Sequence, residues 1–173
     1  MDRDDGFEGA AELAGYFLAH TVCVIQQGET LVPLVGHERV VTEEGERAFA
    51  LLRFEALEPR DALRNAEHWL ETNPQGVARA VLIQDGFLTW LGVRRDAMFS
   101  KLVDFRRPRR SCEVVIPYRH PRDVGGFAIH RPKLLNPSGL PDDLRSVTKA
   151  LYRGVDAHVQ GSKIWARYLD QSA

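Results

Sequence analysis

Residues 80–91 read AVLIQDGFLTWL, and this stretch decides the fold that the sequence predicts. It holds two β-rich runs, Ala80–Ile83 and Phe87–Leu91, on either side of Asp85-Gly86. An Asp-Gly pair accommodates the positive φ angles of a tight primed turn, which joins antiparallel strands. We therefore expect a β-hairpin that turns at Asp85-Gly86, within a mostly antiparallel sheet.

Further strands are expected on both sides of this hairpin. The runs Val22–Ile25 and Leu31–Val35 flank Gly28 and predict a second hairpin. Residues 48–54 alternate between apolar and more polar side chains, which predicts a strand with one wet face. Downstream, strand patterns lie near residues 98–105, 112–118 and 126–129.

Three helical regions complete the pattern. Apolar residues recur at the spacing of one helical face over residues 7–18 and predict the first helix. Pro59 starts a second amphipathic helix, which ends at Asn73-Pro74-Gln75-Gly76. Pro141-Asp142-Asp143 marks the start of a third helix, which we expect Gly161 to break.

The element order αββαβββββα(α) predicts one α+β domain over residues 1–173. We expect about six to eight strands, built from hairpins, with the N-terminal, central and C-terminal helices packed mainly on one face. Hydrophobic residues make up 44% and charged residues 27% of the chain, which is typical of a globular domain. This composition argues against a disordered or fibrous protein.

The N-terminal end carries no sign of export or membrane insertion. It reads Asp2-Arg3-Asp4-Asp5, whereas a secretory signal begins with a positively charged region. The most apolar stretch, residues 10–25, is interrupted by Glu12 and His20 and is shorter than the roughly 20 residues that span a bilayer. We expect a soluble cytoplasmic protein that makes no membrane contact.

No motif for a metal or cofactor is recognisable in the chain. Cys23 and Cys112 stand apart from any CxxC or Cys/His cluster, and we expect both to be small buried hydrophobes. Glu67-His68 lacks the second histidine of a zinc-binding HExxH helix, so we expect His68 to be exposed. Neither phosphate-loop pattern, GxxxxGK[ST] or GxGxxG, occurs. The expectation is therefore no metal and no cofactor.

Charge is unevenly distributed along the chain, although the formal net charge is only −1. Residues 1–93 hold 7 Arg/Lys and 16 Asp/Glu, whereas residues 94–133 hold 11 and 4. Guanidinium groups bind phosphate or carboxylate in a bidentate fork. The basic segment 94–133 therefore predicts an anion site for RNA or another phosphate-rich ligand, formed by eight residues: Arg106, Arg107, Arg109, Arg110, Arg119, Arg122, Arg131 and Lys133.

A second interpretation of this basic segment needs no ligand. The arginines would then lie in a solvated loop, or pair with the surplus carboxylates of the first half, and strand alternation would scatter them onto opposite faces. If acidic and basic surfaces lie apart, the same asymmetry favours self-association between complementary faces of two copies.

The histidines are the remaining candidates for catalytic chemistry. His120 and His130 lie among arginines and are the best general acid-base candidates, but a hairpin between them would hold their rings roughly 15 Å apart. His20 and Cys23 invite a thiol-imidazole interpretation, which requires contact between their side chains. We expect instead that His20 ends the first helix and that Cys23 faces the core.

No complete catalytic constellation can be assembled from these residues. The leading hypothesis is a non-catalytic domain that acts through contacts with a partner protein or with itself. The alternative is a protein that binds anions or nucleic acid through segment 94–133. A hydrolase or phosphoryl-transfer enzyme that uses His120 and His130 comes third.

Overall fold

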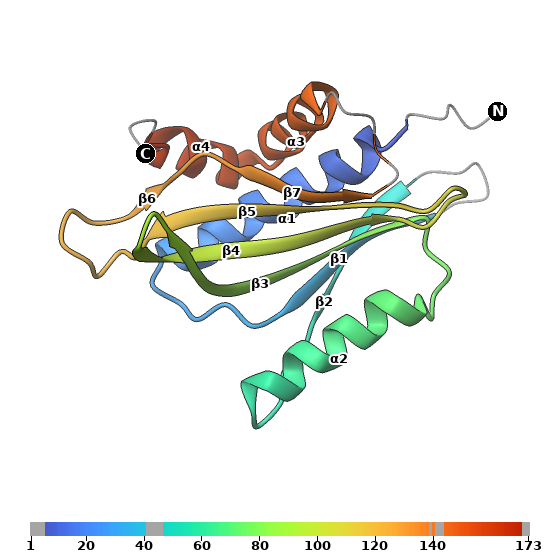
Figure 1. The fold of residues 1–173 in the computed structure, drawn as a ribbon, viewed down its shortest axis with the longest axis horizontal. Helices are drawn as coiled ribbons and strands as arrows, with labels where there is room; N and C mark the ends of the chain where they lie inside the picture. Colours follow the sequence, from blue (N-terminus) through green and yellow to red (C-terminus); the bar gives the residue numbers. More distant parts are fainter. Residues whose placement is uncertain (1–5, 41–46, 139, 141–143, 171–173) are drawn as a thin grey trace.

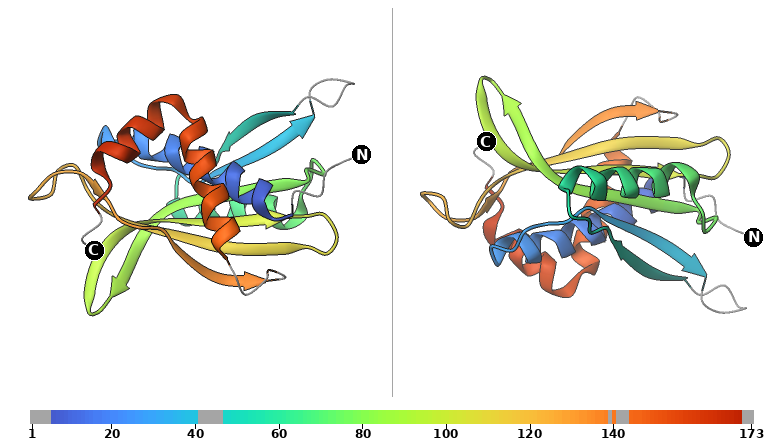
Figure 2. Two further views of the ribbon diagram at one scale, coloured as in Figure 1. Left: turned by 90° about the horizontal axis from the view of Figure 1, so that it is seen from above. Right: turned by 90° about the horizontal axis from the view of Figure 1, so that it is seen from below.

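The computed structural model describes residues 6–40, 47–138, 140 and 144–170, which form an α+β fold. Three helices cover one face of an antiparallel sheet and one helix lies on the other face (Figure 1). Figure 2 shows the same layers from above and below. The helices are α1 (Glu8–Gln26), α2 (Pro59–Thr72), α3 (Arg145–Ala157) and α4 (Val159–Tyr168).

The sheet has seven strands in the order β2-β1-β3-β4-β5-β6, and β7 also pairs with β5. All of these pairings are antiparallel. The strands are β1 (Leu34–Val40), β2 (Arg47–Arg53), β3 (Arg79–Trp90), β4 (Val93–Asp104), β5 (Arg110–Arg119), β6 (Ala128–Ile129) and β7 (Lys133–Ser138). The sequence therefore predicted the α+β fold class and the mostly antiparallel sheet correctly, whereas several individual strands differ.

The central hairpin, β3–β4, turns six residues later than predicted. Leu91 and Gly92 have φ angles of +50° and +76°, and they supply the primed turn that had been assigned to Asp85-Gly86. Gly86 lies inside β3, where the edge of the Phe99 ring is 3.1 Å from the position that a β-carbon would take. Continuous pairing from Arg79↔Asp104 to Trp90↔Val93 outweighs the local turn preference of Asp-Gly.

The predicted hairpin around Gly28 was also wrong. Helix α1 does not end at His20 but continues through Val22 and Ile25, and both of these side chains are buried. Burial around most of the helix overrides the β preference of this run. The first hairpin is instead β1–β2, whose connection, residues 41–46, lies outside the described residues.

The C-terminal helices differ from the prediction in one respect. The break between α3 and α4 comes at His158, whose side chain accepts a hydrogen bond from the Gly161 backbone and caps α4. Gly161 is buried inside α4, where a β-carbon would collide with the backbone of Ala19. The predicted helix start at residues 141–143 and the acidic residues 2–5 lie outside the described residues.

Helix α2 matches its predicted bounds and packs on the opposite face of the sheet. It begins at Pro59 and is followed by Asn73 in the left-handed conformation. Ala66 and Leu70 pack against Leu82 and Val103 to form a small second core. The part of this face that lies toward the end of the β3–β4 hairpin is left without a helix, as the view from below in Figure 2 shows.

Helix α1 is enclosed between the sheet on one side and α3 and α4 on the other. Its close approach to α3 depends on two glycines. A β-carbon on Gly15 would overlap the carbonyl oxygen of Leu151, and one on Gly154 would overlap that of Glu12. The two backbones therefore touch directly. Within the described ranges, no helix combines the length and the apolarity needed to cross a bilayer.

This contact predicts that Gly154→Ala destabilises the protein. At an open helical position the same change adds helix propensity of roughly 1 kcal/mol. Here the overlap with Glu12 must separate α1 from α3, and we expect the free energy of unfolding to fall by about 3 kcal/mol. Urea titration followed by circular dichroism measures this free energy of unfolding. Lys149→Ala, on the exposed side of α3, is the control and should shift the value by less than about 0.5 kcal/mol; a stabilised Gly154→Ala variant would contradict the close contact.

Candidate functional site

The eight predicted anion-binding residues divide between the two ends of β5. Four of them, Arg106 to Arg110, lie in and just after the β4–β5 turn, and the other four lie at or beyond Arg119. Ten extended residues span roughly 30 Å, so the two groups cannot hold one small anion together. The β4–β5 turn and the loop after β5 lie at opposite ends of the molecule in Figure 1.

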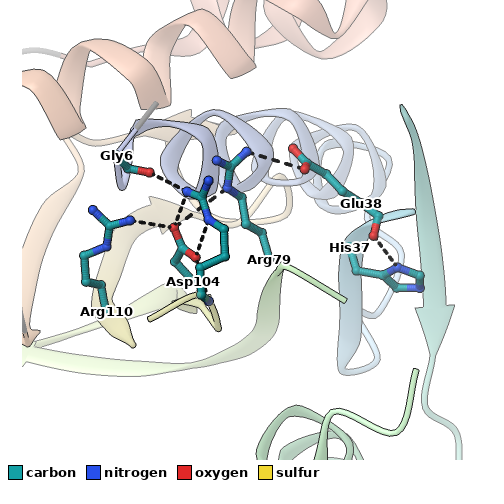
Figure 3. Close-up of polar contacts among 7 residues, drawn as sticks. Gly6, His37, Glu38, Arg79, Asp104 and Arg110 are labelled. Atoms are coloured by element: carbon teal, nitrogen blue, oxygen red, sulfur yellow. Dashed lines mark hydrogen bonds and ion pairs between the residues drawn. The ribbon is translucent and has the colours of Figure 1, made fainter. Parts of the chain in front are cut away.

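At the first end, a buried carboxylate binds the arginines. Asp104 is fully buried and receives the Arg106 side chain in a fork, with Nε 3.0 Å from Oδ1 and Nη2 2.7 Å from Oδ2. Arg110 Nη2 donates to the same Oδ2 over 3.1 Å. Arg79, which is buried, places Nε 3.9 Å from Oδ2 and Nη1 3.5 Å from Glu38 Oε2. Figure 3 shows this cluster, in which Arg106 also donates to the Gly6 carbonyl.

The electrostatics of this cluster favour an ionised Asp104. Burial by itself opposes the charge, but the hydrogen bonds from Arg106 and the positive charges of Arg106 and Arg110 outweigh it. The pKa of Asp104 is therefore held below its usual range. Arg106 and Arg110 are paired with a carboxylate inside the protein. Our second interpretation of the basic segment expected pairing of this kind. Their carboxylate partner, however, comes from the basic segment itself.

The cluster predicts a pH-dependent loss of stability in Asp104→Asn. Removing one partner from a buried ion pair costs about 3–5 kcal/mol, because the arginines lose their counter-charge. The folded pKa of Asp104 lies below its unfolded value of 3.8, so the ionised group contributes stability above that value, and this contribution is lost as the pH falls through the folded pKa. Denaturant titrations should show a large gap between wild type and variant at pH 7 that narrows below pH 4.

The matched control is Asp61→Asn, because Asp61 pairs with Arg64 on the exposed surface of α2. We expect it to cost less than about 0.5 kcal/mol at either pH. An Asp104→Asn variant as stable as the control at pH 7 would contradict the role assigned to the cluster.

The other two arginines of this turn lie at the surface. Arg107 is exposed, and the Arg109 guanidinium lies 5.2 Å from the centre of the Phe105 ring. Arg109 also lines a hollow of about 180 Å³ between α2 and the sheet. Glu67, Glu71 and Glu113 border the same hollow, so this part of the surface has mixed charge.

The opposite end of the molecule carries an exposed apolar surface. We call it the hairpin end and define it as residues 85–96 of β3–β4 together with residues 119–133. Four large apolar side chains of the hairpin are exposed, at 59%, 50%, 90% and 51% of their area: Phe87, Trp90, Leu91 and Val93. Single exposed apolar residues are common, but four on one hairpin are a concentration of the kind that marks an interaction site, with Phe87 on one face of the ribbon and the Trp90–Val93 pair on the other.

Cations lie against two of these apolar side chains. The Arg94 guanidinium lies 3.8 Å from the centre of the Phe87 ring, and Lys133 Nζ lies 4.4 Å from that of Trp90. Arg119 donates to the carbonyls of Gly125 and Gly126 and thereby fixes the loop after β5. Of the predicted residues, Arg119, Arg122, Arg131 and Lys133 belong to this end.

A cleft between the hairpin and the outer edge of β5 contains His130. The ring is only 6% exposed, and its Nε2 lies 3.4 Å from Arg95 Nη1. Because a guanidinium can only donate, Nε2 accepts and the proton lies on Nδ1. Burial, and then the charge of Arg95, lower the pKa of His130, which favours this neutral form. On one side the ring lines a hollow of about 460 Å³, and on the other a cavity of about 170 Å³.

A partly buried hydrogen bond links β3 to β5 at the base of the hairpin end. Tyr118 on β5 donates its hydroxyl to Asp85 Oδ1 over 2.9 Å. Burial raises the pKa of Tyr118, and the neighbouring Asp85 charge raises it further, so the phenol stays a neutral donor. Asp85, which was expected to form a turn, instead links β3 to β5 across β4.

The two histidines proposed for catalysis occupy different surroundings. His120 Nδ1 accepts from the Arg122 backbone, and the His120 backbone donates to Asp123, so this residue shapes the loop. His130 lines both cavities described above, and His120 lines neither. Their positions give no direct support to a two-histidine mechanism.

The cysteines and the remaining histidines behave mostly as structural residues. Both thiols are free and buried, and burial raises the pKa of Cys23 and, to about 11, that of Cys112. Cys23 Sγ bonds the Ala19 carbonyl. His20 packs against His158, with ring centres 5.7 Å apart. The prediction of buried cysteines is confirmed, as is the exposure of His68.

Sequence reasoning missed the residues that give the hairpin end its character. Arg94 and Arg95 lie in the predicted basic segment 94–133 but were not among its eight named residues, and the turn placed at Asp85-Gly86 left Trp90 inside a strand. The usable signal was Leu91-Gly92, which places these side chains at the tip of a long hairpin. Within the described ranges, no group of three His, Cys, Asp or Glu side chains is positioned to hold a metal ion.

Comparison with known proteins finds no matching family model, no similar curated sequence and no similar solved structure. The interpretation of the hairpin end therefore depends on its own geometry.

Proposed function

We propose that this domain is a protein-binding module, and that the hairpin end captures an acidic segment of a partner that also carries apolar side chains. The observation that carries the proposal is the joint exposure of Phe87, Trp90, Leu91 and Val93 on one hairpin with cations around them. Aromatic and arginine side chains are the residue types that contribute most to protein interfaces.

Charge complementarity supports an acidic partner. The hairpin end holds six Arg/Lys and three Asp/Glu. All six cations make no ion pair within 4 Å in the described part of the chain: Arg94, Arg95, Arg119, Arg122, Arg131 and Lys133. Their charge is available to attract and orient a carboxylate-rich segment. A wholly polar anion would leave the exposed apolar side chains uncovered, so this surface suits a polypeptide better than a bare polyanion.

A second copy of the chain is the second candidate. Helix α2 and its N-cap residue expose three glutamates away from the hairpin end, Glu58, Glu67 and Glu71. A contact between the hairpin end of one copy and α2 of another would be heterologous, and such contacts close into rings or continue as filaments.

The experiment uses fluorescence anisotropy with three labelled probes: a random Glu/Tyr copolymer, polyglutamate and single-stranded oligo-U RNA. We expect the Glu/Tyr copolymer to bind most tightly, and more weakly at 300 mM than at 50 mM salt. The double variant Phe87→Ser/Val93→Ser should weaken binding of the copolymer roughly 30-fold, as loss of a hot spot of about 2 kcal/mol does.

The control is Phe49→Ser, since Phe49 is an exposed aromatic residue on β2, outside the hairpin end. It should leave binding unchanged. RNA binding tighter than that of the copolymer would replace the proposal with nucleic-acid binding. A salt-sensitive increase in molar mass with concentration, lost in Glu67→Gln/Glu71→Gln, would identify a second copy as the occupant.

A further inference from the structure

The smaller cavity at the hairpin end has the composition of a ligand site. It measures about 170 Å³ and is lined by three apolar residues, two cations and one histidine: Trp90, Leu91, Pro117, Arg95, Lys133 and His130. No carboxylate lines it. The cavity therefore combines a net positive charge with apolar walls.

His130, which lines this cavity, carries a buried hydrogen-bond donor that has no acceptor among the described residues. The His130 backbone donates to the Pro117 carbonyl, which fixes the residue against β5, and Nε2 is occupied by Arg95. The remaining Nδ1 is buried and has no hydrogen-bond partner among the described residues. Protein interiors rarely leave such a donor unsatisfied, and an absent ligand or water is one of the usual reasons.

The two cations of the cavity are also without a counter-charge. Arg95 contacts His130, and Lys133 lies over Trp90, but neither has a carboxylate within 4 Å in the described part of the chain. An arginine beside a lysine offers a planar fork and a point charge, which together suit the two oxygens of a carboxylate.

The volume and the walls of the cavity determine the size and the apolar character of the rest of the ligand. An engineered protein cavity of about 150 Å³ lined by apolar side chains holds one benzene molecule. This cavity is of similar volume, and Trp90, Leu91 and Pro117 supply apolar surface for a flat body. The available space therefore corresponds to one ring with one acidic group.

We propose that this cavity binds a small monocarboxylate with an apolar body about the size of a single ring, such as benzoate. Arg95 and Lys133 hold the carboxylate, and Trp90, Leu91 and Pro117 enclose the ring. The site shares side chains with the surface of the proposed function, but a small molecule can occupy it without a partner protein.

Isothermal titration calorimetry on the full chain tests this, with benzoate, benzyl alcohol and inorganic phosphate as probes. We expect benzoate to bind with a Kd on the order of 0.1–1 mM, as its few atoms allow, and neither of the others to bind below about 10 mM. Arg95→Gln and Lys133→Gln should each weaken benzoate at least about 10-fold. The matched controls Arg122→Gln and Lys163→Gln, which remove cations that do not line the cavity, should change nothing.

Three results would overturn the proposal. Benzyl alcohol binding as well as benzoate would show that the carboxylate is not recognised. Phosphate binding without benzoate would identify an inorganic anion site. No benzoate binding at 10 mM by a folded wild-type protein would remove the site altogether.

The variant Phe87→Ser/Val93→Ser separates the two proposals, since neither residue lines this cavity. It should keep its affinity for benzoate while it loses the Glu/Tyr copolymer. A failure of one proposal is therefore visible without a failure of the other.

Discussion

The direct contact between the backbones of α1 and α3 is the constraint on which the rest of this structure depends. Gly15 and Gly154 allow the helices to touch, and Gly161 brings α4 onto the same helix. This closeness keeps α1 enclosed against the sheet, where its apolar surface forms the main core. With three helices gathered on one face, the opposite face has only α2, and the end of the β3–β4 hairpin is free of helices.

Local signals identified α2, because single residues set both of its boundaries. Pro59 and Asn73 bound α2 in the sequence and in the structure, because each constrains the backbone at its own position. The strand preference of Val22–Ile25 failed, since burial in α1 outweighs the few tenths of a kcal/mol per residue by which such residues disfavour a helix. The turn predicted at Asp85-Gly86 was wrong for a similar reason, because twelve paired residues on each strand outweigh a local turn preference.

The candidate site was less predictable, because it depends on contacts between distant residues. The basic segment was visible in the sequence, but Asp104 lies within it and its burial gives no local signal. Arg79 and Gly6 reach Asp104 and Arg106 from other parts of the chain. The division of the arginines between two ends follows from the length of β5, which only its pairing with β4 defines. The clustering of arginines in the sequence therefore indicated a concentration of positive charge, but not which of these side chains share one surface.

The length of the β3–β4 hairpin has a consequence for solubility. In the described part of the chain, β1 pairs with β3 only as far as Ile83, and β5 reaches β4 only as far as Asp96. The tip is thus a two-stranded ribbon with backbone hydrogen-bonding groups along both sides, which is a template for edge-to-edge aggregation. Arg94 and Arg95 lie on this ribbon, so two such tips repel one another as they approach. The positive charge that we propose attracts an acidic chain therefore also opposes strand pairing between two copies.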